Sequence, residues 1–166
     1  MQVETLVLGQ LSTNCYLIKK GKDVLIIDPA DDALAIISAC NGYNVVGILV
    51  THHHFDHIGA LNELEKNYDL THNFFDIPTF DFEVIKTPGH TDDSISFYFK
   101  QEKLLFSGDF IFKEAVGRCD FPESSEADMI ESLNMISTYP DDIIIYPGHG
   151  PITTLKDEKQ NFKYYF

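Results

Sequence analysis

Short apolar runs bounded by glycine, aspartate and proline recur along the chain and predict a series of β-strands. The run at residues 44–51 is almost continuously apolar, which is typical of a strand buried inside a protein, and the segment at residues 142–150 is predicted to be another buried strand. A glycine between two lysines at residues 20–22 predicts a tight turn between two strands. The strands expected from this pattern lie at residues 3–9, 14–20, 23–29, 44–51, 82–90, 94–100, 103–109 and 142–150.

Between the groups of strands, other segments have apolar residues at the spacing of a helix face. In one of them Ser125 precedes Asp128 by three residues, which is the pattern of a capping box. Periodicity alone supports a mixed α/β fold. The order of the elements suggests two sheets packed face to face with helices outside, a four-layer αββα sandwich. The helices expected lie at residues 31–40, 57–68, 125–137 and 155–166.

Length and charge limit the classes of function that the sequence allows. The chain has 166 residues, which fits a single domain over residues 1–166. Its formal net charge of −14 disfavours nucleic-acid phosphates and anionic membranes, so neither is expected as a partner. No stretch reaches the roughly 18 apolar residues of a membrane span, and the first residues do not resemble a signal peptide. We therefore expect a cytoplasmic protein.

The cysteines argue against two kinds of site. Cys15, Cys40 and Cys119 are odd in number, far apart and outside any CxxC pair. This spacing predicts neither a disulfide framework nor a thiolate zinc site. Cys15 and Cys40 stand among apolar residues and are expected to be buried.

Histidines gather in the segment "THHHFDH", which directly follows an apolar strand. Because side chains at i and i+2 share a face of an extended chain, His52 and His54 are expected to point one way and His53 the other. Asp56 continues the first face, and a turn into a helix would return His57 to the same point. Imidazole and carboxylate are ligands expected for Zn²⁺ and for Fe, Mn or Co, so this segment predicts a metal centre.

Three further apolar strands end in a polar residue beside glycine. They are His90 in "TPGHT", Asp109 in "LLFSGD" and His149 in "YPGHG". Glycine lets the backbone approach a centre closely. This repetition of a strand followed by a ligand residue predicts that the strand ends hold a metal.

Together these segments resemble the metallo-β-lactamase superfamily. The pair Asp28-Pro29 and the motifs "THHHFDH", "PGHT", "SGD" and "PGHG" occur in that family's order, and the similarity runs from about Asn14 to Thr154. The phrases "TNCYLI", "LLFSGDFIF", "VGRCDFP" and "YPGHGPITT" are similar to its glyoxalase II-like branch, the hydroxyacylglutathione hydrolases. The resemblance implies the four-layer αββα sandwich of this family.

The resemblance also implies a ligand set for two divalent metal ions, Zn²⁺ first, with Fe or Mn as alternatives. His53 and His72 match no ligand position and are not expected to bind catalytic metal. Asp28 matches the family's first acidic motif and is expected to hold the ligand loop by hydrogen bonds. The implied ligands are His52, His54 and His90 for the first ion, Asp56, His57 and His149 for the second, and Asp109 bridging both.

The activity implied is that of a metal-dependent hydrolase. It would be a thioesterase that acts on S-acyl glutathione, or a related small thioester, through a metal-bridging hydroxide. Asp56 would be both a metal ligand and the catalytic residue that orients the hydroxide. Arg118 stands where glyoxalase II enzymes carry a lysine that contacts glutathione. From the sequence it either binds substrate or pairs with Asp120 and fixes a loop.

Two other functions stay open at this point. One is a single-iron persulfide dioxygenase, whose phrase "GRTDF" is close to "GRCDF" here, although it would need only the first ligand set. The other is a non-enzymatic metal-binding protein. The thiol carrier is also open, because the segment between His57 and His90 is short and "GHTDDS" replaces the family's "GHTPGS". The helical C-terminal domain that grips glutathione in full glyoxalase II enzymes is expected to be absent.

Overall fold

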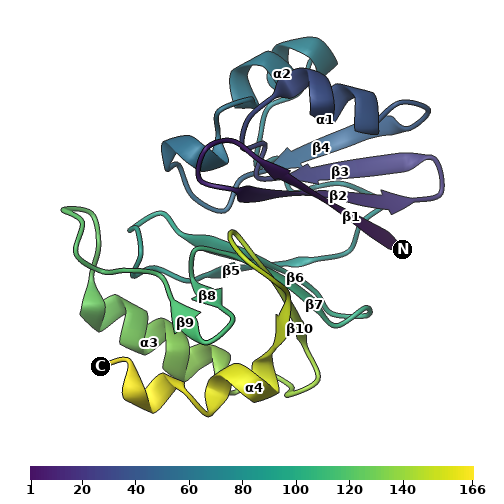
Figure 1. Ribbon diagram of the computed structural model, residues 1–166. Helices are drawn as coiled ribbons and strands as arrows, with labels where there is room; N and C mark the ends of the chain where they lie inside the picture. The colour runs from purple at the N-terminus through teal and green to yellow at the C-terminus, as the bar shows by residue number, and fades with distance from the viewer. The chain divides into compact units, whose positions relative to one another are not determined.

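The computed structural model describes all residues 1–166, and its backbone divides into two compact units, Met1–Asp81 and Phe82–Phe166. Each unit contains its own β-sheet and its own helices (Figure 1). The assignment of residues 1–166 to a single domain stays a prediction.

The first unit is built on a four-stranded sheet in the order β1-β2-β3-β4. The pairs β1–β2 and β2–β3 are antiparallel, whereas β3 and β4 run parallel. Gly21, with φ of 62°, lies in the predicted turn between β2 and β3, a conformation that glycine adopts without steric cost. Each strand overlaps the segment predicted for it, and the four are β1 (Gln2–Leu8), β2 (Thr13–Lys20), β3 (Asp23–Ile27) and β4 (Asn44–Leu49).

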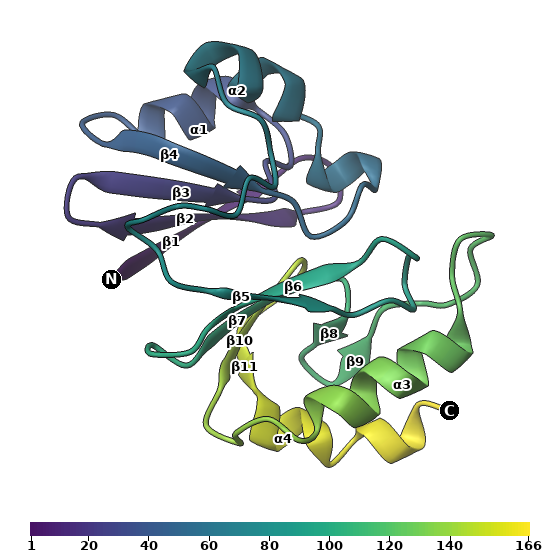
Figure 2. The same ribbon diagram turned by 180° about the vertical axis from the view of Figure 1, so that it is seen from behind.

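Two α-helices of the first unit cover the same face of this sheet (Figures 1 and 2). Side chains that alternate along the strands, such as Leu17, Ile26 and Ile48, pack with Ile36 and Leu64 of the helices in one buried cluster. Burial of each such side chain contributes roughly 1.5–3 kcal/mol, so the cluster holds the sheet and with it the end of β4. The helical elements are α1 (Ala33–Ala39), the 3-10 helix η1 (Phe55–His57) and α2 (Leu61–Tyr68).

The helix predicted at residues 57–68 begins later than expected, at Leu61. The backbone N–H groups of Gly59 and Ala60 donate to carbonyl oxygens of residues 29–30, each at 3.0 Å. Because these donors bond outside the helix, they anchor the chain before α2 to the segment that follows β3. A β-carbon on Gly59 would lie 2.3 Å from one of those carbonyl oxygens, so the close approach requires glycine.

The second unit is built on a five-stranded sheet in the order β11-β10-β7-β6-β5. Strands β10 and β7 run parallel, and the other neighbours are antiparallel. The longer strands fall in the predicted segments: β5 (Glu83–Lys86), β6 (Ile95–Phe99), β7 (Leu104–Gly108) and β10 (Ile144–Pro147). The pattern did not predict the two-residue strands β8 (Ile111–Phe112), β9 (Ala115–Val116) and β11 (Thr153–Thr154).

Helices α3 and α4 lie on one face of this sheet (Figure 2). Met129 and Leu133 of α3 pack with Ile85, Leu105 and Ile145 of the strands in a second buried cluster. The predicted C-terminal helix is shorter than expected, because the aromatic residues near the end favour a helix less than the residues before them. The elements are α3 (Glu126–Ile136), α4 (Leu155–Lys159) and the 3-10 helix η2 (Phe162–Tyr164). None of the helices in either unit is both long and apolar enough to cross a membrane.

The N-terminus of α3 offers a test of the local structure. The Ser125 hydroxyl accepts the backbone N–H of Asp128 at 3.2 Å, as the capping box predicts. Ser125→Ala removes this acceptor and should lower the free energy of unfolding by about 1 kcal/mol, measured by urea denaturation. Glu131→Ala, at an exposed position in the same helix, is the control and should change stability far less. Equal effects of the two variants would contradict the assigned cap.

Candidate metal centre

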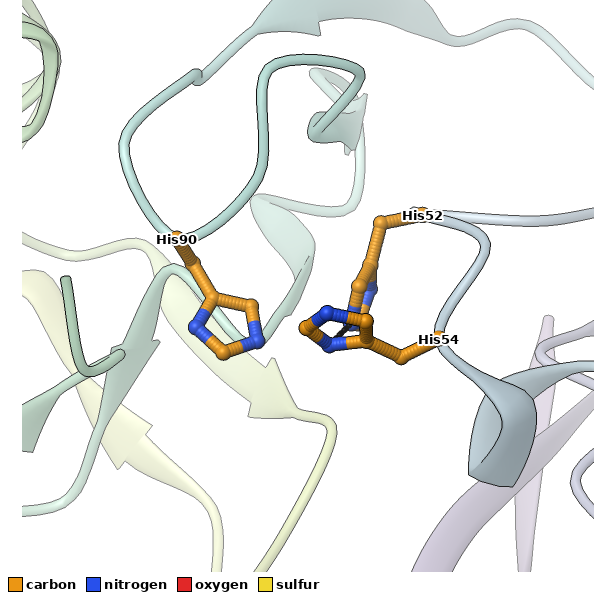
Figure 3. Close-up of side chains that lie close together, drawn as sticks. All are labelled: His52, His54 and His90. Carbon is orange, nitrogen blue, oxygen red and sulfur yellow. Dashed lines mark hydrogen bonds between the residues drawn. The ribbon is translucent and has the colours of Figure 1, made fainter. Parts of the chain in front are cut away.

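His52 and His54 follow the end of β4, and their side chains lie on the same side of the chain, as their spacing predicts (Figure 3). His52 is buried, and its Nε2 lies 3.1 Å from Nδ1 of His54. Their ring centroids are 4.8 Å apart with the rings nearly perpendicular. Two ring nitrogens of the histidine segment therefore lie side by side.

His57 lies at the end of η1 and is completely buried. Its Nδ1 lies 2.8 Å from Oδ2 of Asp28, and its ring centroid is 4.2 Å from that of His52. A carboxylate oxygen accepts hydrogen bonds, so Nδ1 of His57 carries the hydrogen. In the neutral ring the lone pair is then on Nε2, which is the state that a metal ligand requires.

Asp28 also holds the residue that begins the histidine segment. Its carboxylate accepts the Thr51 backbone N–H at 2.7 Å and the Thr51 hydroxyl at 2.8 Å. Since the hydroxyl hydrogen is used in this way, the hydroxyl oxygen can only accept from Nδ1 of His52, which lies 3.1 Å away. The lone pair of neutral His52 is then also on Nε2. Asp28 is 2% exposed and adopts a φ of 51°, so this residue is placed by its hydrogen bonds rather than by backbone preference.

Asp56 belongs to η1 and lies beside His57. Its Oδ2 accepts the Thr13 hydroxyl at 2.8 Å and lies 3.5 Å from Nε2 of His57. Thr13, at the start of β2, is 1% exposed. It was not predicted from the sequence, where nothing near it points to a residue 43 positions later.

A cavity of about 370 Å³ lies beside Asp56 within the first unit. Part of its lining is apolar, because Leu8, Leu11 and Phe55 contribute side chains, and Asp31 adds a carboxylate. Phe55 is 74% exposed, so the cavity is open to solvent at that side chain. The lining therefore combines apolar side chains with the carboxylates of Asp31 and Asp56.

His90 (Figure 3) lies in the loop after β5, in the second unit. Its Nδ1 lies 2.9 Å from the carbonyl oxygen of Arg118, which can only accept, so the hydrogen is on Nδ1. Its Nε2 lies 3.5 Å from Oδ2 of Asp109. The second unit thus holds this histidine in the same way as the first unit holds His57, with Nδ1 bound and the lone pair on Nε2.

Asp109 and His149 follow the ends of the parallel neighbours β7 and β10. Nε2 of His149 lies 3.5 Å from Oδ2 of Asp109, the same oxygen that lies near His90. Two imidazole nitrogens and one carboxylate oxygen of the second unit therefore meet at one point. Parallel strands end at the same edge of a sheet, which explains why residues 40 positions apart in sequence converge.

Gly117 is a residue of this site that the sequence did not single out by itself. A β-carbon there would lie 1.9 Å from the carbonyl oxygen of Asp109 and 2.9 Å from Cβ of His90. Its N–H donates to the carbonyl oxygen of Phe110 at 3.2 Å. The glycine of "VGRCDFP" therefore permits the close packing that holds both predicted ligands.

The side chain of Arg118 forms a two-pronged ion pair with Asp120, with both nitrogen–oxygen distances at 2.6 Å. These hydrogen bonds hold the pKa of the Asp120 carboxyl below its usual range. Both side chains are more than half exposed, so the pair contributes little to stability. The guanidinium also lies 4.5 Å from the ring centroid of Phe121. The structure shows the pairing with Asp120, and substrate binding by Arg118 stays a prediction.

The cysteines are poorly suited to be nucleophiles or metal ligands in their present surroundings. Burial raises the pKa of the Cys15 thiol, and it raises that of Cys40 to about 11. Burial also raises the pKa of Cys119. Because the thiolate is the reactive and metal-binding form, protonated thiols leave imidazoles and carboxylates as the donors of the predicted site. That donor set fits Zn²⁺, Fe or Mn.

The sequence model of the Metallo-beta-lactamase superfamily matches residues 8–72 and 69–149, which together make up most of the chain. These matches include each residue of the predicted ligand set. The chain therefore belongs to the metallo-β-lactamase superfamily.

Individual relatives agree with this assignment over nearly the whole chain. Hydroxyacylglutathione hydrolase GloC of Haemophilus influenzae is 28% identical, over 97% of this chain and 96% of that protein. The crystal structure of BLEG-1 B3 metallo-beta-lactamase is 29% identical, with a TM-score of 0.91 over 98% of this chain and 99% of that chain. The crystal structure of TTHA1623 in a di-iron-bound form is 31% identical, with a TM-score of 0.85 over 96% of this chain and 98% of that chain.

The predicted α/β fold of the metallo-β-lactamase type and the likeness to hydroxyacylglutathione hydrolases are thus confirmed. The superfamily's fold binds divalent metals, and the relatives of this chain include proteins named as hydrolases. The identity of the metal, the substrate, the cellular compartment and the role of each site residue stay predictions.

The buried carboxylate of Asp28 offers a direct test of the site's framework. Asp28→Asn replaces one acceptor oxygen with an NH₂ group, so a donor from Thr51 or His57 loses its partner. We expect the free energy of unfolding to fall by about 1–3 kcal/mol, measured by urea denaturation. Asp31→Asn, at an exposed position three residues later, is the control and should have a much smaller effect. An Asp28→Asn variant as stable as the wild type would contradict the hydrogen-bond network described.

Proposed function

We propose that the chain is a binuclear metal-dependent hydrolase that cleaves thioesters. The observation that carries this proposal is the state of the imidazoles. His57 and His90 each have Nδ1 bound to an oxygen acceptor, which leaves the lone pair on Nε2 beside a carboxylate. Metal-ligating histidines are typically held in this way, by a carboxylate or carbonyl oxygen on the far nitrogen.

The proposed ligands divide between two divalent ions, following the order of the family's motifs. Imidazoles dominate the first set, and carboxylates enter the second set and the bridge, a combination suited to Zn²⁺, Fe or Mn. The first ion would be held by His52, His54 and His90, the second by Asp56, His57 and His149, and both by Asp109.

Two divalent ions, when bound, supply hydroxide at neutral pH and polarise a carbonyl group. Asp56 would orient the attacking oxygen by accepting a hydrogen bond from it. Because the Thr13 hydroxyl donates to Oδ2 of Asp56, this carboxylate has a fixed direction before substrate binds. Asp28 would act only through His57 and Thr51, by keeping the ring and the loop in place.

A thioester is the proposed substrate class for two reasons. A thiol has a pKa of about 8.5, so the thiolate can leave with little help from a proton donor. The relative from Haemophilus influenzae is named a hydroxyacylglutathione hydrolase, which makes S-acyl glutathione the first substrate to test. The cavity beside Asp56, with its partly apolar lining, would take a small acyl group.

Arg118 is the proposed contact for the thiol carrier. Asp120 occupies Nε and Nη2 of its guanidinium, and a guanidinium has five N–H donors, so Nη1 could bind a carboxylate of glutathione. The second candidate function, a single-iron persulfide dioxygenase, is favoured only by the phrase "GRCDF" at residues 117–121. The complete second ligand set favours the hydrolase.

The first prediction from this proposal concerns metal content. Protein purified under metal-replete conditions should contain about two equivalents of metal per chain, measured by element analysis. His54→Ala should lose metal, because it removes a ligand of the first ion. Phe55→Ala, next to it in sequence and mostly exposed, is the control and should keep the wild-type content. A ceiling of one equivalent in a protein of full activity would rule out the binuclear site.

The second prediction concerns the reaction. Metal-reconstituted protein should release thiol from S-lactoylglutathione and consume no oxygen with glutathione persulfide. Asp56→Asn should lower kcat for thiol release by about 10²–10⁴-fold, since it removes the residue that orients the attacking oxygen. Asp31→Asn, whose carboxylate lies in the same cavity, is the control for a change of charge. Iron-dependent oxygen uptake, with no thioester cleavage under zinc, iron or manganese, would establish the dioxygenase instead.

A further inference from the structure

Two histidines outside the family's ligand set meet on the surface of the first unit. Nε2 of His53 lies 3.1 Å from Nε2 of His72, and the ring centroids are 5.3 Å apart. His53 follows β4 and is exposed, unlike the buried His52, whereas His72 follows α2. Residues 19 positions apart thus bring the outer nitrogens of two rings to the same place.

The state of the His72 ring is set by Glu65 on α2. One oxygen of this carboxylate, Oε1, accepts the His72 backbone N–H at 2.8 Å and lies 2.7 Å from Nδ1 of the ring. Because a carboxylate accepts and does not donate, the hydrogen of neutral His72 is on Nδ1 and the lone pair is on Nε2. That lone pair points toward His53.

We propose that His53 and His72 form a binding site for a divalent cation of the class that prefers imidazole, namely Zn²⁺, Ni²⁺ or Cu²⁺. Two nitrogens at the Zn–N distance in a tetrahedral site lie about 3.3 Å apart, close to the separation found here. Glu65 completes the carboxylate–histidine arrangement that orients metal-binding imidazoles. No remaining protein ligand is required, because His53 is exposed and water can fill the other positions.

A cation can bind at this pair without any change in the charge of the two rings. In the metal-free pair, Nε2 of His53 donates its hydrogen to Nε2 of His72. When the cation binds, His53 carries its hydrogen on Nδ1 instead, so both rings stay neutral and both Nε2 lone pairs face the cation. The chain's formal net charge of −14 raises the local concentration of cations and favours this binding.

A zinc titration tests the site apart from the proposed activity. Protein already loaded with metal and desalted is titrated with Zn²⁺ and followed by calorimetry. The wild type should take up one more equivalent than the variant with both His53→Gln and His72→Gln. Glu65→Gln should bind this equivalent about 10–100-fold more weakly. Glu63→Gln, an exposed carboxylate on the same helix, is the control and should bind it as the wild type does.

Ring ¹⁵N NMR of the wild type gives a second readout that needs no variant. Added Zn²⁺ should shift Nε2 of His53 and of His72 together, and leave Nδ1 of His57 unchanged. Equal zinc uptake by the wild type and the double variant, or unshifted rings, would reduce the pair to an ordinary hydrogen bond between two histidines. Either outcome is independent of thioester hydrolysis, which the His72→Gln variant should retain.

Discussion

The carboxylate of Asp28 is the constraint on which the histidine segment of the first unit depends. It receives a backbone N–H and a hydroxyl from Thr51 and lies against Nδ1 of His57, all within 2.8 Å. At 2% exposure the side chain is buried, so these protein groups are its main partners. A buried polar group is tolerated only when it is hydrogen-bonded, so the residue after β3, the start of the histidine segment and η1 are held as one structure.

The second unit positions its predicted ligand residues in a different way. There the sheet itself supplies the order, because β7 and β10 are parallel neighbours and their ends carry Asp109 and His149. Gly117 then allows a loop to pack against the backbone of Asp109, which brings the carbonyl of Arg118 to His90. Nε2 of His90 and Nε2 of His149 thus both lie 3.5 Å from the same oxygen of Asp109.

The sequence allowed the longer elements to be predicted because each carries its own periodic signal, as the apolar run at residues 44–51 does for β4. The position of the histidine motif at the end of that strand could also be predicted, because the motif directly follows the apolar run in the sequence. The two-residue strands β8 and β9 are too short to have a period. Thr13 and the backbone bonds of Gly59 were missed for another reason: their partners are distant in sequence, and only the folded chain brings them together.

The alternation of His52, His53 and His54 makes this short segment unusually intolerant of insertions and deletions. Because neighbouring side chains face opposite sides, adding or removing one residue before the segment would exchange the two faces. The imidazole of His53, which now lies against His72, would then turn inward. The rings of His52 and His54, which now lie side by side, would turn outward. Related chains should therefore differ in length after α2, whereas the number of residues between β4 and η1 should stay constant.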